Sequence, residues 1–336
     1  MEKTIPRGSW LEADAFRELV REIAPLQVGG WSVAEFERAT AVLGWELREP
    51  TEVAGQVWRR FAPRKGPWGG YGTVIADPSE PERIRTLRVP VVDLPPEDVR
   101  TAADLVRAAW WVMEEELGRP AAWGGDVGPW MLWRRPGSSL VVHADSEGQV
   151  DLDLVPTDTD ADAAGRSGSR GVWRAADPAH LPPAHVAPVG TGDGWDAVRK
   201  RLHQALRALA HDTPFLPGRF ILHLGSAQDP QRFVQCWNDG LELVIEATGL
   251  MHHPELADPA RLSESGWTLS HSLWKRRFPG AMEDGTASGT AARMLVEALQ
   301  GLGVERDDLV YDGTVSGRGH GFHLDLPRAG LRRGRS

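Results

Sequence analysis

Two histidine pairs have the residue type and spacing that come closest to a metal site, because neutral imidazoles commonly bind zinc and related ions. His252 and His253 are adjacent, while two residues separate His320 from His323. In a strand, residues one or three positions apart point to opposite faces, so neither pair can hold one ion unless a bulge intervenes. Neither pair has a companion group of cysteines. We therefore predict no metal site.

The other reactive residue types lack the surroundings that catalysis or cofactor binding requires. The glycine-rich loop Gly66–Gly72 has no Lys-Ser/Thr pair of a phosphate-binding loop and does not lead directly into a helix. The single cysteine, Cys236, is expected to be a buried apolar residue rather than a nucleophile. We predict a non-enzymatic protein with no catalytic residues and no cofactor.

Two carboxylate pairs occur on single faces of predicted strands: Asp151 with Asp153, two positions apart, and Glu242 with Glu246, four positions apart. Alternate positions share one face of a strand, and apolar residues occupy the positions between them. We expect both pairs on solvent-facing sides of sheets. A paired-carboxylate active site is the alternative, and it is defined by a spatial separation that the sequence does not give.

The tryptophan content is the feature that most suggests binding. The chain has 15 tryptophans and only two tyrosines, and each indole brings a large apolar area and one N–H donor. A cluster surrounds the end of one predicted helix and the strand after it: Trp110, Trp111, Trp123, Trp130 and Trp133. Adjacent helical residues diverge by about 100°, and strand residues three apart face opposite sides. We predict that some of these indoles form a partner-binding face; core packing is the alternative.

Helix and strand patterns cover both halves of the chain. Capping-box spacing at Ser9–Glu12 and Ser32–Glu35 predicts helices over the apolar stripes that follow. Further helices are predicted at about 97–117, 195–210, 258–266 and 286–300. Strands are predicted at 45–47, 57–61, 71–76, 84–92, 130–133, 139–143, 149–155, 219–224, 233–237, 241–247 and 321–326. Because the strands cluster as hairpins bracketed by helices, we predict an α+β fold of antiparallel sheets with helices packed mainly on one face.

The composition changes sharply in the middle of the chain. Residues 157–193 are rich in proline, glycine and aspartate and have no hydrophobic period, which is typical of a flexible linker. The sequence therefore predicts an N-terminal domain at 1–156, a linker at 157–193, a C-terminal domain at 194–328 and a basic disordered tail at 329–336.

The formal net charge of −9 gives no general attraction for nucleic acid or anionic lipid. No apolar run approaches the ~18 residues of a membrane span, and the N-terminus lacks the apolar core of a signal peptide. We expect no nucleic-acid or membrane partner and a cytoplasmic location.

Residues 43–62 and 265–279 share a pattern: a helix end, Gly-Trp-x-Leu, a spacer, then Trp, basic residues and Phe. Glycine suits the left-handed position that ends a helix, and the next tryptophan can pack back on that helix. The residues expected in these structural roles are Gly44, Trp45, Trp58, Gly266, Trp267 and Trp274. We predict an internal duplication that forms a pseudo-dimer within one chain; chance similarity is the alternative, because the spacers differ in length.

The C-terminal half contains, in order, RFVQCWNDGLELVIEATG, LADPARLSESGWTLS, LWKRRFP and TAARMLVEALQGLGV. With these motifs, residues 195–310 resemble the actinobacterial TY-Chap group, whose domains are similar to type III secretion chaperones of the Tir-chaperone type and to YbjN. The N-terminal half, with LGWEL, WRRF and PWMLWRR, is similar to another actinobacterial family and is a candidate diverged copy. The resemblance implies secretion-chaperone-like domains that bind protein or peptide, and it supplies no catalytic residues.

The leading hypothesis is therefore a chaperone-like adaptor that holds a segment of a protein partner on a sheet or an aromatic face. An immunity protein that neutralises a toxin is the alternative, because an acidic chain suits a basic toxin surface. An enzyme with a site assembled only by the fold is the third hypothesis.

Overall fold

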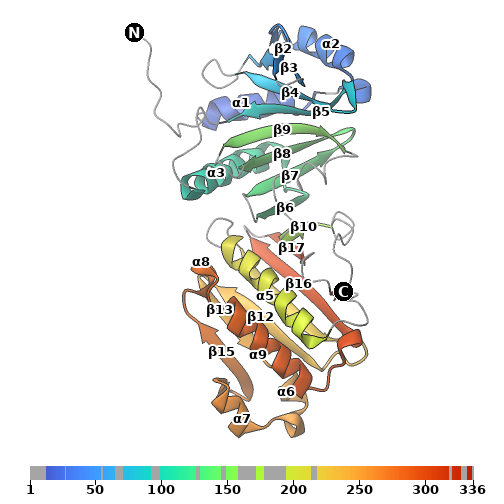
Figure 1. Cartoon of the computed structure of the whole chain (residues 1–336). Coiled ribbons are helices and arrows are strands. Elements are labelled where there is room, and N and C mark those ends of the chain that lie inside the picture. The colour runs from blue at the N-terminus through green and yellow to red at the C-terminus, as the bar shows by residue number, and fades with distance from the viewer. Residues whose placement is uncertain are drawn as a thin grey trace. The chain divides into compact units, whose positions relative to one another are not determined.

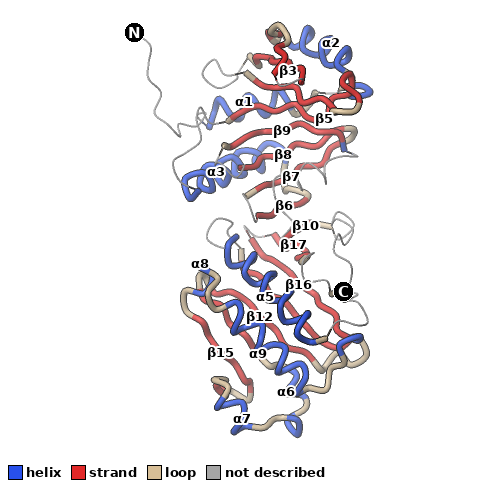
Figure 2. Tube along the Cα trace, in the orientation of Figure 1, coloured by secondary structure: helices blue, strands red, loops and turns tan. Residues whose placement is uncertain are grey.

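The computed structural model shows a mixed α+β chain (Figure 1). Its contacts divide it into two compact units: unit 1 comprises residues 1–123 and 127–169, and unit 2 comprises residues 124–126 and 170–336. Figure 2 maps the helices and strands along the trace. The structure describes residues 13–26, 28–53, 56–64, 71–91, 99–125, 129–144, 149–157, 172–177, 194–212, 218–317, 320–326 and 331–334. The capping box at Ser9–Glu12 lies outside these ranges.

Unit 1 contains an antiparallel sheet. Its paired strands are, in spatial order, β1 (Glu46–Leu47) and β2 (Thr51–Val53) beside β3 (Gln56–Ala62), then β4 (Gly72–Asp77), β5 (Glu80–Pro90), β9 (Val150–Pro156), β8 (Ser138–Ala144) and β7 (Trp130–Arg135). β6 (Ala122–Gly125) precedes β7 in the chain. The register places Leu154 of β9 opposite both Leu87 and Leu140, so apolar side chains line one face.

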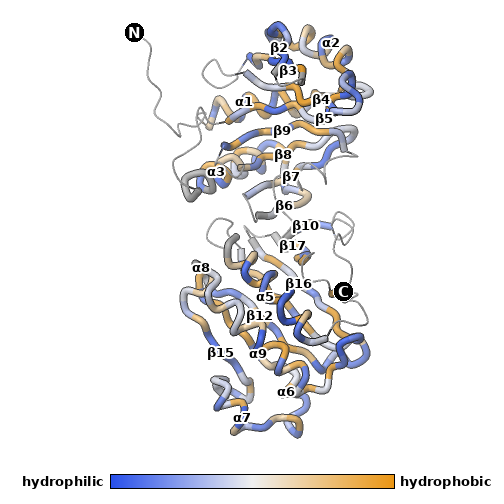
Figure 3. The backbone as a smooth tube through the Cα atoms, in the orientation of Figure 1, coloured by the Kyte–Doolittle hydropathy of each residue, from blue (hydrophilic) through white to orange (hydrophobic). Residues whose placement is uncertain are grey.

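Helices α1 (Ala13–Ile23) and α3 (Val99–Leu117) pack together in unit 1, and α3 contacts β7, β8 and β9. α1 buries Phe16, Leu19 and Val20, one stripe of its amphipathic surface. The 3₁₀ turn η1 (Gly29–Trp31) leads into α2 (Val33–Leu43), which contacts β5. Ser32 caps α2 by accepting a hydrogen bond from the Glu35 backbone N–H, as its capping-box spacing predicts. Figure 3 maps hydropathy onto the same trace.

Unit 2 contains a second, largely antiparallel sheet. Its strands are, in spatial order, β10 (Val172–Ala175), β17 (His320–Asp325), β16 (Leu309–Gly317), β11 (Arg219–Ser226), β12 (Phe233–Asp239), β13 (Glu242–Glu246), β15 (Leu273–Phe278) and β14 (Thr268–Ser270). α5 (Trp195–Asp212) and α9 (Ser288–Gly301) lie side by side over one face (Figure 1). The smaller helices are α6 (Gly249–His252), η4 (Pro254–Leu256), α7 (Pro259–Glu264), α8 (Ala281–Asp284) and η5 (Arg306–Asp308).

The predicted linker and tail need correction where the structure describes them. β10 lies inside the segment 157–193, and its backbone pairs with β17. Arg332 and Arg333, predicted to be disordered, form β18 (Arg332–Arg333), which pairs in parallel with β16. Backbone pairing can order a polar segment that has no apolar stripe of its own. Residues 158–171, 178–193, 329–330 and 335–336 lie outside the described ranges.

The predicted repeat is present as a local turn. Gly44 and Gly266 have positive φ values of 68° and 86°, and the N–H of the following Trp45 or Trp267 donates to the carbonyl five residues earlier. The strands around the two turns connect differently. β3 pairs with β4, which follows it in the chain, whereas β15 pairs with β13, which precedes the turn. The duplication is not confirmed.

No helix in the described part of the chain is long and apolar enough to cross a bilayer.

Candidate functional site

A cavity of about 340 Å³ opens in unit 1 among β3, β4 and β5, and we name it the Trp58 pocket. Apolar lining comes mainly from Val57, Trp58, Val74, Ile75, Pro78 and Pro81. Arg59, Asp77 and Arg85 add charge to the lining. Trp58 is 39% exposed and Val57 is 44% exposed. Single exposed apolar residues are normal, but neighbouring ones that line a cavity are typical of a binding site.

The turn between β4 and β5 shapes one wall of this pocket. The Asp77 carboxylate accepts hydrogen bonds from the Ser79 hydroxyl at 2.6 Å and from the Ser79 backbone N–H at 2.9 Å. These two bonds, with the positive charges of Arg85 and Arg83, hold the pKa of Asp77 below its ordinary value. Such side-chain-to-backbone bonding is how aspartate stabilises a tight turn. Asp77 therefore fixes the turn that carries Pro78.

A second cavity, of about 440 Å³, lies between η1 and the beginning of β5. Its lining includes Trp31, Glu80, Glu82 and Arg83. Trp31 has a positive φ of 51°, an uncommon conformation for a bulky residue. Its indole N–H donates to the Gly137 carbonyl at 3.1 Å. The indole is thereby held in place beside two exposed carboxylates.

A buried ionic cluster spans β5, β8 and β9 of unit 1. Arg88 donates to Asp153 through Nε at 2.9 Å and Nη2 at 2.8 Å, and Nε2 of His143 lies 3.1 Å from the same carboxylate. Asp151 is 3.5 Å from Arg88. Asp151 and Asp153 are only 2% and 4% exposed, so the prediction that they face solvent was wrong. Both faces of β9 are buried, and cationic partners from neighbouring strands compensate the carboxylates.

The charges of this cluster stabilise one another. Burial alone would raise the pKa of Asp153, but the His143 charge and the Arg88 and His143 hydrogen bonds outweigh it and hold that pKa well below the ordinary value. Burial would lower the pKa of His143, but the charge and hydrogen bond of Asp153, with Asp151, raise it overall. Among the described residues, Nδ1 of His143 has no hydrogen-bond partner.

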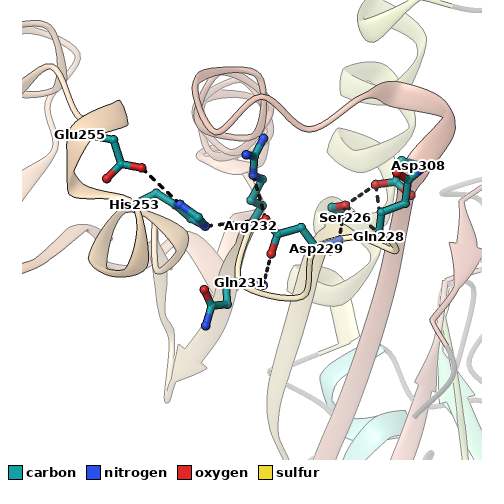
Figure 4. A network of polar contacts seen from close by, with 8 residues as sticks. All are labelled: Ser226, Gln228, Asp229, Gln231, Arg232, His253, Glu255 and Asp308. Atoms are coloured by element: carbon teal, nitrogen blue, oxygen red, sulfur yellow. Dashed lines mark hydrogen bonds and ion pairs between the residues drawn. The ribbon is translucent and has the colours of Figure 1, made fainter.

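A polar network in unit 2 organises the connection between β11 and β12 (Figure 4). Ser226 donates to Asp308, and its hydroxyl accepts from the backbone N–H groups of Gln228 at 3.1 Å and Asp229 at 2.9 Å. Asp229 in turn accepts from Arg232 Nε at 3.0 Å and lies 3.8 Å from His253 Nε2. Ser226 binds Asp308, whereas His253 lies beside Asp229, so the two side chains do not form a nucleophile–base pair. The network instead stabilises the turn.

The predicted tryptophan face is wrong for most of its members. Trp110, Trp123, Trp130 and Trp133 are 0%, 1%, 0% and 3% exposed, whereas Trp111 is 51% exposed. Trp130 and Trp133 lie on opposite faces of β7, as predicted, but both faces are covered. Trp133 donates to the Gly118 carbonyl at 2.8 Å. These indoles build the core of unit 1, with Trp110 and Trp123 in ring contact at 5.5 Å.

Most tryptophans of the repeat motif are also buried, and one is exposed. Trp45 is buried and stacks on Phe61 with ring centroids 5.1 Å apart, and Trp267 and Trp274 are also buried. Trp58 lines the pocket instead. The sequence assigned it a structural role, although the two arginines that follow it on β3 are polar neighbours typical of a partly exposed strand.

The remaining candidates do not form a reactive site. His252 contacts Phe233, while His253 lies beside Glu255 and Asp229. His323 of β17 pairs with Thr314 of β16, and the side chain of His320 is not among those that the structure describes.

The second carboxylate pair and the cysteine are also accounted for. Glu242 forms an ion pair with Arg277. Glu246, which was predicted to face solvent, is buried and accepts a hydrogen bond from Gln235. Burial raises the pKa of the Cys236 thiol to about 12. Within the described ranges, no histidine, cysteine and carboxylate group has the arrangement of a metal site.

No protein-family model matches the chain, and no curated protein matches it in sequence.

Proposed function

We propose that the protein is a non-enzymatic, chaperone-like adaptor that acts in the cytoplasm and binds a peptide segment of a protein partner in the Trp58 pocket. The observation that carries the proposal is the cavity itself, whose wall leaves Trp58 and Val57 substantially exposed. Covering apolar surface contributes about 25 cal/mol per Å², and tryptophan is among the residue types enriched at interface hot spots.

One expectation from the sequence and one structural observation support the proposal. The resemblance of residues 195–310 to secretion-chaperone-like domains favours protein binding over catalysis. Within each unit, the polar clusters that the structure describes are internally paired: Asp153 binds Arg88 and His143 in unit 1, and Ser226 donates to Asp308 in unit 2.

Selection from peptide libraries tests the proposal directly. Short random peptides, displayed in one library with a free N-terminus and in another with a free C-terminus, would be selected on the full-length chain. Enriched peptides would be synthesised, and their affinities measured by calorimetry for the wild type, for Trp58→Ala and for Trp111→Ala. We expect Trp58→Ala to weaken binding by at least about tenfold, as at other hot-spot tryptophans.

Trp111→Ala is the matched control, because Trp111 is an exposed tryptophan of the same unit that does not line the pocket. It should leave affinity unchanged. Failure of both libraries to yield a binder, or equal binding by Trp58→Ala and the wild type, would contradict the proposal.

A further inference from the structure

We infer that the Trp58 pocket takes the free C-terminal end of a peptide whose last residue is apolar. The apolar side chain would pack beside Trp58, and the terminal carboxylate would pair with Arg85. This inference rests on the proposed function and specifies the chemistry of the partner segment.

Arg85 is the first observation that points to an anion. Its side chain lines the pocket and is partly buried. Among the described residues it makes no hydrogen bond or ion-pair contact, and Asp77 attracts it only from a distance. A guanidinium that is partly withdrawn from water without a partner favours an incoming carboxylate, with which it can form two parallel hydrogen bonds.

Two arginines, Arg59 and Arg85, line the pocket against the single carboxylate among the described lining residues, that of Asp77. The hydrogen bonds from Ser79 fix that carboxylate in the turn while it keeps its negative charge. Glu82 lies 3.7 Å from Nη2 of Arg59, but its side chain is 77% exposed. Water and salt weaken a contact of that kind. Arg59, whose side chain is 19% exposed, therefore adds to the positive potential in the pocket.

The size of the pocket favours a chain end over a chain that passes through. Its volume of about 340 Å³ is small for a ligand site. A C-terminal residue carries its apolar side chain and its carboxylate on the same Cα atom, so both groups fit into one such cavity. An internal acidic residue would also have to place the continuing chain on both sides.

Anisotropy measurements with fluorescein-labelled peptides test the inference. The peptides would be the enriched sequences from the free-C-terminus library and simple glycine-serine peptides ending in Leu, Phe or Trp, each as the acid and as the amide. We expect the acids to bind wild type at least about tenfold more tightly than the amides. Arg85→Gln should reduce that ratio to near one, and Arg85→Lys should restore part of it, because lysine keeps the charge but not the planar fork.

Arg38→Gln serves as the control, because Arg38 is an exposed arginine of α2 outside the pocket; it should keep the wild-type ratio. Thermal unfolding of each variant checks that the fold is retained. Equal affinity of acids and amides for the wild type would overturn the inference. If Trp58-dependent peptides came only from the free-N-terminus library, the inference would fail while the proposed function stood; if no peptide bound in either form, both would fail.

Discussion

The carboxylate of Asp153 on β9 lies 3.1 Å from Nε2 of His143 on β8, in a part of unit 1 where both side chains are almost completely buried. Arg88 holds the same carboxylate from the other side. A buried charge without partners is costly, so the three residues stabilise the fold only as a set. Removal of one of the three leaves a buried charge without its partner, which destabilises the fold.

The first prediction concerns the pH dependence of unit 1. The folded-state pKa of His143 is raised above the ordinary 6.5. Its stabilising contribution is therefore fully present below the unfolded-state pKa and is lost as pH rises through the folded-state pKa. The free energy of unfolding of the wild type should fall as pH rises from the unfolded-state pKa of His143 through its folded-state pKa. His143→Gln should be less stable at low pH and should lack this fall.

Hydrogen exchange of the β8 and β9 amides, measured from mildly acidic to alkaline pH, would report on this part of unit 1. The groups that face His143 are Asp151, Asp153 and Arg88, and none of the three is altered in the variant. His203→Gln, on exposed α5 surface, should keep the wild-type profile. A His143→Gln profile parallel to that of the wild type would contradict the prediction.

The second prediction compares two adjacent tryptophans of α3. Trp110→Ala should destabilise unit 1 by about 3–5 kcal/mol, because it removes a fully buried indole that contacts Trp123. Trp111→Ala should cost roughly half as much or less, because Trp111 is 51% exposed and loses less buried apolar area. Urea unfolding followed by circular dichroism measures both. Similar losses for the two variants would contradict the assignment of Trp110 to the core.

The sequence predicted the positions of the strands better than the burial of their side chains. The strands predicted at 233–237 and 241–247 are confirmed as β12 and β13, in which Asp239 pairs with Glu242 beside a turn where Gly240 has a φ of 59°. The alternation of Asp151 and Asp153 correctly placed both on one face, but period alone does not tell whether that face is covered. Burial of a charged face depends on partners such as Arg88, which lies more than sixty positions away.

The Trp58 pocket could not be predicted for a related reason. Its walls come from β3, β4 and β5, and the register between β4 and β5 shifts near Ala76. A shift of one residue exchanges the side chains that face the cavity with those that face away. The residue types of Trp58 and Arg85 were visible in the sequence, but their convergence depended on that irregular pairing.

The third prediction uses the two tyrosines of the chain. The Tyr311 hydroxyl donates to Asp325 at 2.6 Å and accepts from the Leu326 backbone N–H at 3.1 Å. Burial and the Asp325 charge raise the pKa of Tyr311. Tyr311→Phe should cost unit 2 about 1–3 kcal/mol, because buried polar groups lose a partner. Tyr71→Phe, at a partly exposed residue, is the control and should have little effect on urea unfolding. Equal effects would contradict the role of the buried hydroxyl.

The fourth prediction concerns the hairpin between β14 and β15. His271 and Ser272 form its two-residue turn, with φ values of 51° and 66°. Residues other than glycine and asparagine are strained there, and Asn-Gly is the preferred pair for this turn. His271→Asn with Ser272→Gly should therefore stabilise unit 2 by about 1 kcal/mol. Ser263→Gly, on exposed α7, makes the same serine-to-glycine change and should instead destabilise it by about 0.5–1 kcal/mol. Urea unfolding measures both, and a shift of the same sign in the two variants would show that the turn is not under backbone strain.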